Sequence, residues 1–443
     1  MSSDLPLNVS EISLKDAVIF IVDNRGKTAP TESTGIALIA TNCVNNKDLY
    51  PQKLNLRYVS QYTYENWFRS HPQPGDILLT NKGSQNGAVC LVPSPVDFCI
   101  AQDMVALRAD PKKINPLYLF AALRSDLVQK RIKALNVDAV IPHLKKTDFD
   151  KLYVPLPEKR VQDWIGDSYF ELSSRIELLR ETNTTLESIA QALFKSWFVD
   201  FDPVHANAGT QASSLPPEIQ SLFPSTFVES SLGLVPEGWG VGTIGDLANV
   251  KGGFAFKGDS FCDSGVPVIK IKNIVGDGTV DIEGVQYVDI EQAEKSKKFL
   301  LDDGDILMAM TGATIGKTGI VVTDSQAPLL NQRVAKFEPK SQDLNNGWLI
   351  YTAFQNGFMA DQILNAASGS AQANISTSGI ESAKLMLPAN PSILKAFEDI
   401  ASTIFSGWIE NHKQSKTLSI LRDTLLPRLI SGQVRLPDIE ECV

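Results

Sequence analysis

The strongest constraint on the fold of this chain is an internal duplication. The segments PGDILLTNKGSQNG (74–87) and DGDILMAMTGATIG (303–316) align without a gap. Three pairs of glycines coincide in this alignment, namely Gly75 with Gly304, Gly83 with Gly312 and Gly87 with Gly316. Glycines at such places suit a tight connection between strands, where a positive φ or a close backbone approach is required. A chain of 443 residues built in this way is expected to form two similar units.

The duplication extends beyond these segments in both directions. GIALIATN (35–42) matches GVPVIKIK (265–272), and AQDM (101–104) matches LNQR (330–333). Within both copies, short β-branched runs and turn residues alternate with a few helical patches, such as residues 115–135. This alternation is typical of an α+β fold. The predicted globular units are residues 1–157 and 241–390.

A long helical segment follows each unit, and the two helical segments also match. The predicted regions are residues 158–204 and 391–436, and apolar residues recur in both at spacings of three and four. A helix of about 35 residues measures about 50 Å at about 1.5 Å per residue, which exceeds what one small domain needs. The two helices are therefore expected to pack against each other. Residues 205–240 are rich in Pro, Ser and Gly and lack Lys and Arg, which marks a connector.

Composition and charge exclude several classes of protein. No stretch is long and apolar enough to span a membrane, and the N-terminus does not have the pattern of a signal peptide. The five cysteines and four histidines are scattered without metal-ligand spacing, which indicates a reducing cytoplasm and disfavours a zinc site. The net charge is −10, but the first unit is mildly basic and the second is acidic. A nucleic-acid interface on the second unit must therefore use a local patch.

The segment TGATIGKTG (311–319) resembles a phosphate-binding loop but departs from it. Three residues separate Gly312 and Gly316, whereas a P-loop needs four, and GIVV (319–322) predicts a strand where a helix should begin. A glycine turn between strands explains the segment better. The chain also lacks the [DN]-P-P-[YF] loop of amino-methyltransferases and any clustered catalytic triad. These absences favour a binding protein over an enzyme.

Several long motifs resemble one known family. They are LSSRIELLRETNTTLESIAQALFKSWFVDFDPV (172–204), LPPEIQSLFP (215–224), LGLVPEGW (232–239) and KTLSILRDTLLPRLISGQVRL (416–436). Together they resemble the conserved regions of type I restriction–modification specificity subunits, and the resemblance spans nearly the whole chain. Val161 and Gln162 depart from the Glu-Gln pair that often begins the first helix in this family.

The resemblance implies an α+β fold with two target recognition domains and two long helices that pair as an antiparallel coiled coil. Each domain would read half of a bipartite sequence in double-stranded DNA, and the helices would set the spacer. The helices would also dock methyltransferase subunits, expected to be two, and the complex would recruit restriction subunits. No cofactor is expected in this chain. S-adenosylmethionine, ATP and Mg are expected in the partner subunits.

Candidate DNA-binding residues are polar residues on loops that flank strands. Arg and Lys can pair with guanine in the major groove and Asn and Gln with adenine, whereas phosphate contacts position the protein. In the first unit the candidates are Asn24, Arg25, Lys27, Asn42, Lys82, Ser84, Gln85 and Gln102. In the second unit they are Lys251, Lys257, Lys270, Lys272, Asn273, Thr311, Thr314, Lys317, Gln332 and Arg333. Solvated loop residues without a ligand are the alternative for each of them.

Candidate docking residues for a partner subunit lie on the long helices, where the apolar stripe is wider than one coiled-coil seam needs. They are Leu179, Leu186, Leu193, Phe194, Trp197, Phe198, Leu421, Leu425, Leu426, Leu429 and Ile430. The alternative is that they form a local core with the connector.

Two other functions remain open at this point. One is a self-contained DNA methyltransferase or nuclease, against which the missing motifs count. The other is a scaffold whose units bind protein rather than DNA, which the acidity of the second unit favours. Salt-dependent binding to a duplex would argue against the scaffold.

Overall fold

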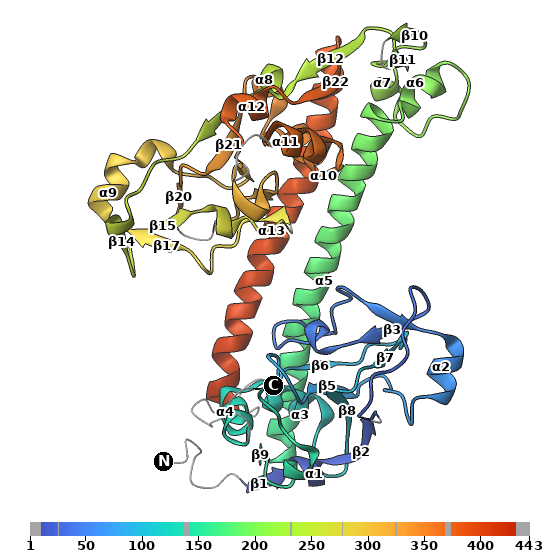
Figure 1. Cartoon of the computed structure of the whole chain (residues 1–443), viewed down its shortest axis with the longest axis vertical. Coiled ribbons are helices and arrows are strands. Elements are labelled where there is room, and N and C mark those ends of the chain that lie inside the picture. The colour runs from blue at the N-terminus through green and yellow to red at the C-terminus, as the bar shows by residue number, and fades with distance from the viewer. Residues whose placement is uncertain are drawn as a thin grey trace, which may run out of the picture. The chain divides into compact units, whose positions relative to one another are not determined.

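The computed structural model of the chain describes residues 10–24, 26–136, 141–230, 233–276, 278–323, 326–367 and 374–430. The chain divides into two compact units. The first unit contains residues 1–178 and 415–443, and the second contains residues 179–414. The long helices α5 (Lys159–Phe198) and α13 (Pro391–Ile430) contribute to both units (Figure 1).

The first unit is an α+β domain with three small sheets. Its central sheet has the strand order β2-β8-β5-β6 and is entirely antiparallel, whereas β3 pairs with β4 antiparallel and with β7 parallel. The third sheet pairs β1 with β9. The strands are β1 (Ser10–Ser13), β2 (Val18–Asp23), β3 (Ile36–Ile39), β4 (Arg57–Val59), β5 (Ile77–Thr80), β6 (Val89–Leu91), β7 (Phe98–Ile100), β8 (Met104–Ala109) and β9 (Tyr153–Leu156). The helices are α1 (Leu14–Ala17), α2 (Gln61–Asn66), α3 (Pro116–Arg124) and α4 (Asp126–Ala134), with short 3-10 turns η1 (Thr41–Cys43) and η2 (Lys146–Asp148).

The second unit repeats this topology. Its central sheet has the order β13-β21-β18-β19-β16, and in its second sheet β15 pairs with β17 antiparallel and with β20 parallel. The strands are β10 (Phe227–Ser230), β11 (Gly233–Pro236), β12 (Trp239–Thr243), β13 (Ala248–Gly252), β14 (Phe261–Cys262), β15 (Val266–Ile269), β16 (Gly278–Thr279), β17 (Gln286–Val288), β18 (Ile306–Ala309), β19 (Thr318–Ile320), β20 (Leu329–Leu330), β21 (Val334–Pro339) and β22 (Lys384–Pro388). The α-helices are α6 (Asp202–Asn207), α7 (Pro217–Gln220), α8 (Ile244–Leu247), α9 (Ile290–Lys295), α10 (Trp348–Gln355), α11 (Phe358–Ala367) and α12 (Thr377–Glu381). The 3-10 turns are η3 (Gly258–Ser260), η4 (Ile271–Asn273), η5 (Lys297–Phe299), η6 (Gly312–Thr314) and η7 (Gln342–Leu344).

The central strands are continuously apolar because both of their faces are buried. In β5, Ile77 and Leu79 join the core under α3, whereas Leu78 points to the core shared with β3 and β7. In β18, Ile306 and Met308 likewise face one core and Leu307 the other. Alternate side chains of a strand point to opposite faces, so one strand supplies two cores.

The glycine turns predicted from the duplication are confirmed in both units. Gly83 and Gly87 have φ values of 93° and 89°, and Gly312 and Gly316 have values of 77° and 80°. Each pair lies between two antiparallel strands, β5 and β6 or β18 and β19. The segment TGATIGKTG is therefore a strand connection and not a phosphate-binding loop.

Helices α5 and α13 run antiparallel in each unit, as expected. In the first unit, Arg422 Nη1 donates to Ser173 Oγ at 3.4 Å. In the second unit, Asn183 Nδ2 donates to the carbonyl of Trp408 at 3.0 Å. The Phe194 ring in that unit packs against Phe397, with centroids 6.2 Å apart. In each unit, therefore, residues further along α5 contact residues nearer the start of α13, as antiparallel helices require.

Candidate nucleic-acid interface

Three connections of the first unit converge at one edge of its sheets. The connection after β5 is tied to the one after β7, because the main-chain N–H of Asn81 donates to the carbonyl of Asp103 at 3.1 Å. The connection after β7 is tied to β3 through Ala101, whose N–H donates to Ile39 at 2.8 Å. The connection after β2 joins them through Asn24, whose Nδ2 donates to the carbonyl of Ile100. The sheet thus gathers loops that are far apart in the sequence.

Most of the candidate residues of the first unit lie exposed on these connections. Lys82, Ser84 and Gln85 are exposed on the turn after β5, and Lys27 is exposed after β2. Asn42 is exposed in η1, and its Nδ2 donates to the carbonyl of Leu54 at 3.1 Å. Gln102 is half-buried after β7. Arg25 lies outside the described residues.

Asn24 does not stand on an exposed loop, so the expected exposure is wrong, while contact with DNA stays a prediction. Its side chain is only 3% exposed, because the residue directly follows β2 inside the edge and its amide group donates inward. Its Oδ1 is buried without a hydrogen-bond partner among the described atoms. Asn24 therefore belongs to the interior of the edge and not to the surface that meets solvent.

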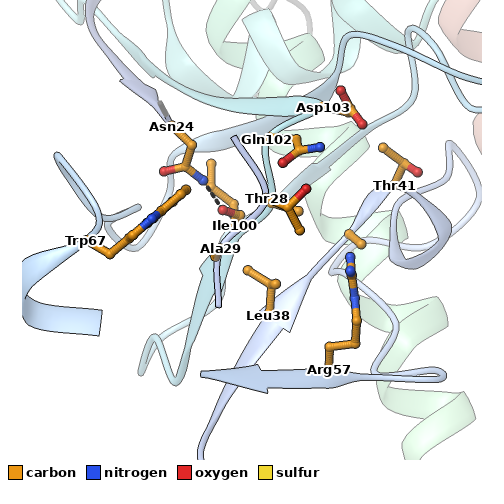
Figure 2. Close-up of a pocket in the computed structure, with 12 residues that line it drawn as sticks. Asn24, Thr28, Ala29, Leu38, Thr41, Arg57, Trp67, Ile100, Gln102 and Asp103 are labelled. Atoms are coloured by element: carbon orange, nitrogen blue, oxygen red, sulfur yellow. Dashed lines mark hydrogen bonds between the residues drawn. The ribbon is translucent and has the colours of Figure 1, made fainter. Parts of the chain in front are cut away.

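A pocket of about 130 Å³ opens beside Asn24 (Figure 2). Polar side chains reach it from four elements: Asn24 from the end of β2, Thr41 from η1, Arg57 from β4, and Gln102 and Asp103 from the connection after β7. Apolar walls come from Ala29, Leu38, Trp67 and Ile100. No sequence motif predicts this pocket, since its lining residues are spread from position 24 to position 103.

The same edge of the second unit is built by corresponding connections. The N–H of Gln332 donates to the carbonyl of Phe254 at 3.0 Å, and that of Met310 donates to the carbonyl of Arg333 at 3.1 Å. Thr311 forms an isolated bridge with Asn374, as Lys82 does with His143 in the first unit. The loops after β13, β18 and β20 therefore meet like their counterparts after β2, β5 and β7.

The candidate residues of the second unit differ in accessibility. Lys257, Lys272, Lys317, Gln332 and Arg333 are exposed, and Thr311 and Thr314 are half-buried. Three lysines are engaged with the protein itself, and one of them is Lys317, whose Nζ donates to the carbonyl of Val275 at 3.2 Å. Lys251 forms an ion pair with Glu338. Lys270 lies 3.3 Å from the centroid of the Phe261 ring, and partial burial together with Lys272 lowers the pKa of Lys270.

Asn273 is a structural residue, which corrects the prediction that it binds DNA. Its side chain is 1% exposed. Its Oδ1 accepts from the N–H of Lys270 at 2.9 Å, and its Nδ2 donates to the carbonyl of Asp281 at 2.9 Å. Both ends of the amide are thus used to close η4, and none is left for a base.

Comparison with known proteins identifies the family of this chain. A family described as "Type I restriction modification DNA specificity domain" matches residues 18–188 and 236–416, which is most of the chain and both copies of the duplication. This chain belongs to that family. As a member, it carries the family's domain twice, in agreement with the repeated topology of the two units.

Individual relatives agree with the family assignment. The specificity subunit of the type I restriction enzyme HindI from Haemophilus influenzae is 26% identical over 417 residues, which cover 81% of this chain and 86% of that protein. The specificity subunit of the enzyme MjaVIII from Methanocaldococcus jannaschii is 25% identical over 367 residues, covering 82% and 80% of the two chains. The crystal structure of a type I S subunit from M. genitalium has the same fold, with a TM-score of 0.57 and 16% identity over 97% of this chain and 99% of the other.

As a member of the specificity family, this chain is a non-catalytic subunit. In the described part of the chain, no three His, Cys, Asp or Glu side chains are grouped so that they could hold a metal ion. No helix that the structure describes is long and apolar enough to cross a membrane.

Several predicted docking residues of this specificity subunit are buried in its own core, and for these the prediction is wrong. They are Leu179, Phe194, Trp197, Phe198, Leu426 and Ile430. The Trp197 ring lies 5.0 Å from Phe223 of the connector, and Phe198 lies 5.6 Å from Trp239. The alternative of a local core with the connector is therefore right for Trp197 and Phe198. Leu421 remains 45% exposed, and Leu186, Leu193, Leu425 and Leu429 are half-buried.

Proposed function

We propose that this chain is the DNA-reading subunit of a type I restriction–modification complex, in which each unit reads one half of a split target. The observation that carries the proposal is the duplicated specificity domain, whose two copies gather exposed polar loops at the same edge of the same fold. Two readers on one chain fit a target with two specified halves. The edge after β2, β5 and β7, and its counterpart after β13, β18 and β20, would face the duplex.

The residues proposed to contact DNA are those that the edge leaves accessible. In the first unit they are Lys27, Asn42, Lys82, Ser84, Gln85 and Gln102, and in the second Lys257, Lys272, Thr311, Thr314, Lys317, Gln332 and Arg333. Gln102 and Gln332 have the amide groups that suit adenine, and Arg333 has the forked donors that suit guanine. The exposed lysines suit phosphate, which positions the protein without reading sequence.

Arg333 offers a direct test of base reading. Replacing Arg333 with Ala should reduce discrimination in one half-site by about tenfold to hundredfold and leave the other half-site unchanged. Selection of bound sequences from a random duplex library by the purified full chain measures this. The matched control is Lys257→Ala, which is expected to weaken binding to all sequences equally. Equal weakening by Arg333→Ala would make Arg333 a phosphate contact.

We further propose that methyltransferase subunits, two per chain, dock on the apolar surface left by the long helices. Its support in the second unit is a cavity of about 290 Å³ that lies beside the end of α5 and is lined by Val199, Leu234 and Met386 among others. Val199 and Leu234 are among its lining residues and are largely exposed. An apolar surface of this kind marks an interaction site. Methyl transfer with S-adenosylmethionine would belong to these partners. Restriction subunits would join the assembled complex and supply ATP- and Mg-dependent cleavage, in the cytoplasm.

A variant at this cavity separates docking from DNA reading. Val199→Glu places a charge in the apolar surface and should reduce co-purification of the methyltransferase at least about tenfold, since a buried unpaired charge is costly. Duplex binding by the isolated chain should be unchanged. Ile290→Glu is the control, because Ile290 is also an exposed apolar residue but lies on α9. Unchanged co-purification with Val199→Glu would exclude this surface.

A protein scaffold is the second candidate function, because the region 241–388 carries more acidic than basic residues. Binding of a duplex by the full chain at increasing salt tests it. DNA recognition predicts a steep linear loss of log affinity with log salt, because phosphate contacts release counterions. A scaffold predicts no duplex binding at low salt.

A further inference from the structure

The pocket of the first unit holds polar groups that converge without satisfying one another. Asn24 is more than nine-tenths buried, and its Oδ1 has no hydrogen-bond partner among the described residues. Within the same part of the chain, the side chains of Arg57, Gln102 and Asp103 take part in no hydrogen bond or ion pair. Buried acceptors in folded proteins are nearly always satisfied, so an unpaired one that lines a pocket indicates a missing ligand.

The walls and size of the pocket restrict the shape of that ligand. Leu38, Ile100 and the indole of Trp67 give it apolar sides, and Asn24, Arg57, Gln102 and Asp103 are the polar and charged groups among its other lining residues (Figure 2). The combination of apolar walls with a few convergent polar groups is that of a small-molecule site. Its volume of about 130 Å³ is close to the roughly 150 Å³ of an apolar cavity that holds one benzene molecule. The pocket therefore fits one six-membered ring with polar substituents.

The position of the pocket indicates where such a ring would come from. It is lined by the same connections, after β2 and after β7, that carry Lys27 and Gln102 at the proposed DNA-facing edge. A planar polar ring delivered at this edge is a nucleobase of the bound duplex. This step rests on the proposed function, since it takes the edge to face DNA.

The second unit has an aromatic side chain at the corresponding place. Ile100 and Leu330 occupy equivalent positions, each paired in parallel with the last residue of the neighbouring strand, Ile39 or Ile269. The carbonyl of Ile100 accepts from the Asn24 side chain, whereas the carbonyl of Leu330 accepts from the main-chain N–H of Phe254 at 2.8 Å. The Phe254 ring packs against Phe256 with centroids 4.9 Å apart. A polar acceptor in one unit is thus replaced by a packed ring in the other.

We propose that this pocket binds a single pyrimidine base turned out of the DNA duplex, and that only the first unit does so. The apolar walls with Trp67 would cover the ring of the base. Solvent does not reach Asn24 Oδ1 in this structure, so its side chain would turn towards the base. The Oδ1 would then accept from the N–H on the pairing edge, which is N3–H in thymine and N4–H in cytosine. Arg57 and Gln102 would donate to its carbonyl oxygens. A purine, with two fused rings, exceeds the space.

Duplexes with one unpaired base test the proposal without knowledge of the target sequence. An unpaired base has already left its pair, so most of the cost of extrusion is removed. The full chain should bind a duplex with one bulged thymine or cytosine about tenfold more tightly than the fully paired duplex. A gain of this size is expected from one added base–aromatic contact. A bulged adenine and a bulged abasic site should give no such gain. Fluorescence anisotropy measures all five affinities.

Variants connect this gain to the pocket. Trp67→Leu, which keeps an apolar wall without a ring, and Asn24→Ala should each remove the tenfold gain while binding of the paired duplex is retained. Tyr62→Ala is the matched control, because Tyr62 is an exposed aromatic residue on helix α2, which ends directly before Trp67, and it lies outside the pocket. Arg57→Met provides a second pocket variant if Asn24→Ala lowers the melting temperature, because Arg57 lines the pocket from β4 and is not among the residues proposed to contact the paired duplex.

Each outcome supports or overturns the proposal. A pyrimidine-specific gain that disappears in the pocket variants supports it. Equal affinity for bulged and paired duplexes overturns it, as does an equal gain with the abasic bulge, which would report bending alone. Equal weakening of all duplexes by the pocket variants also overturns it. Failure to bind even the paired duplex would overturn the proposed DNA recognition together with this inference, and the paired control distinguishes that case.

Discussion

The two units begin equivalent helices in different ways. In the first, Asn115 caps α3 with its own side chain, accepting from the N–H of Tyr118 at 3.0 Å. In the second, the cap position of α10 is Gly347, and the side chain of Glu398 on α13 reaches across instead. Its two oxygens accept from the N–H groups of Trp348 at 3.1 Å and Leu349 at 2.9 Å. The residue at the corresponding place on α5 is Gly166.

This difference shows that one backbone arrangement allows two solutions to the same requirement. The first N–H groups of a helix have no partner inside the helix, so a side chain must supply one when the end is buried. A Cβ on Gly166 would lie 2.6 Å from the N of Tyr118, which leaves no room for a side chain from α5. In the second unit the cap residue is a glycine, and a glutamate on the long helix supplies the acceptors. In the first unit Asn115 supplies the acceptor itself, and the corresponding position on the long helix is Gly166.

A second pair of equivalent contacts differs in strength. Asp76, which is 2% exposed, accepts from Nε and Nη2 of Arg108, both at 2.9 Å. In the second unit, Asp305 accepts from Lys336 at 2.7 Å. Arginine binds a carboxylate with two parallel hydrogen bonds, whereas lysine binds it as a point charge.

The largest expected effect comes from breaking the arginine pair. Arg108→Ala should destabilise the first unit by about 3 kcal/mol, because it leaves the buried carboxylate of Asp76 with the N–H of Gln73 as a donor but without a countercharge. Lys336→Ala should cost the second unit only about 1 kcal/mol, because burial already raises the pKa of Asp305 and favours its neutral form. Urea denaturation of the two variants measures both. Equal losses would contradict the distinction between the pairs.

Removal of the Glu398 carboxyl group should have the next largest effect on stability. Glu398→Ala leaves two buried N–H groups without an acceptor and should cost about 2 kcal/mol. Asn115→Ala should cost about 1 kcal/mol, the usual loss of a cap, because Gln162 still accepts from the N–H of residue 115 at 2.9 Å. Chemical denaturation again compares them. A larger loss for Asn115→Ala would mean that Glu398 does not serve as the cap of α10.

Glu398 should also make the stability of the second unit depend on pH. Burial raises the pKa of Glu398 from 4.5 to about 8. The folded chain therefore keeps a proton that the unfolded chain releases between these values. Stability is fully present below pH 4.5 and should fall by about 1 kcal/mol per pH unit as pH rises towards 8. Glu398→Gln should flatten this slope in melting curves, whereas Glu218→Gln, at an exposed position, should keep it. An unchanged slope in Glu398→Gln would exclude Glu398 as its source.

The smallest expected effect tests the empty position on α5. Gly166→Ala should destabilise the first unit by about 1 kcal/mol, because overpacking against Tyr118 outweighs the better helix propensity of Ala. Gly240→Ala is the control, since a Cβ at Gly240 meets no atom within 4 Å. A higher melting temperature of the Gly166→Ala variant would contradict this, because it would show that α3 and α5 move apart enough to accommodate the added methyl group.

The duplication made much of the fold predictable. Paired glycines, alternating burial in β5 and β18, and the two helical stripes all depend on local residue patterns that sequence retains. The accessibility of single residues was less predictable. Asn273 reads as a polar loop residue, yet its contact with Asp281 closes a turn through tertiary packing. Whether an amide faces solvent or the main chain depends on such contacts, which short motifs do not specify.

Long-range packing also explains the missed core around α5. Trp197 and Phe198 have the helical spacing of an exposed apolar stripe. Their partners are Phe223 in the connector and Phe397 on α13, and Phe397 lies some two hundred positions later in the chain. The pocket beside Asn24 could not be predicted from short motifs for the same reason, because five separate segments line it. Residue type predicted the chemistry at these positions, but only the fold decides which side chains meet.

The most direct test of the central claim, that the two units read two halves of one DNA target, is a map of N6-methyladenine across the host genome with and without this gene. Deletion of the gene is expected to abolish methylation at one split motif of two short half-sites. Arg333→Ala is expected to relax only one of those halves. Co-expression with the methyltransferase subunit ensures that the partner is active. An unchanged methylation map under that condition would contradict the account.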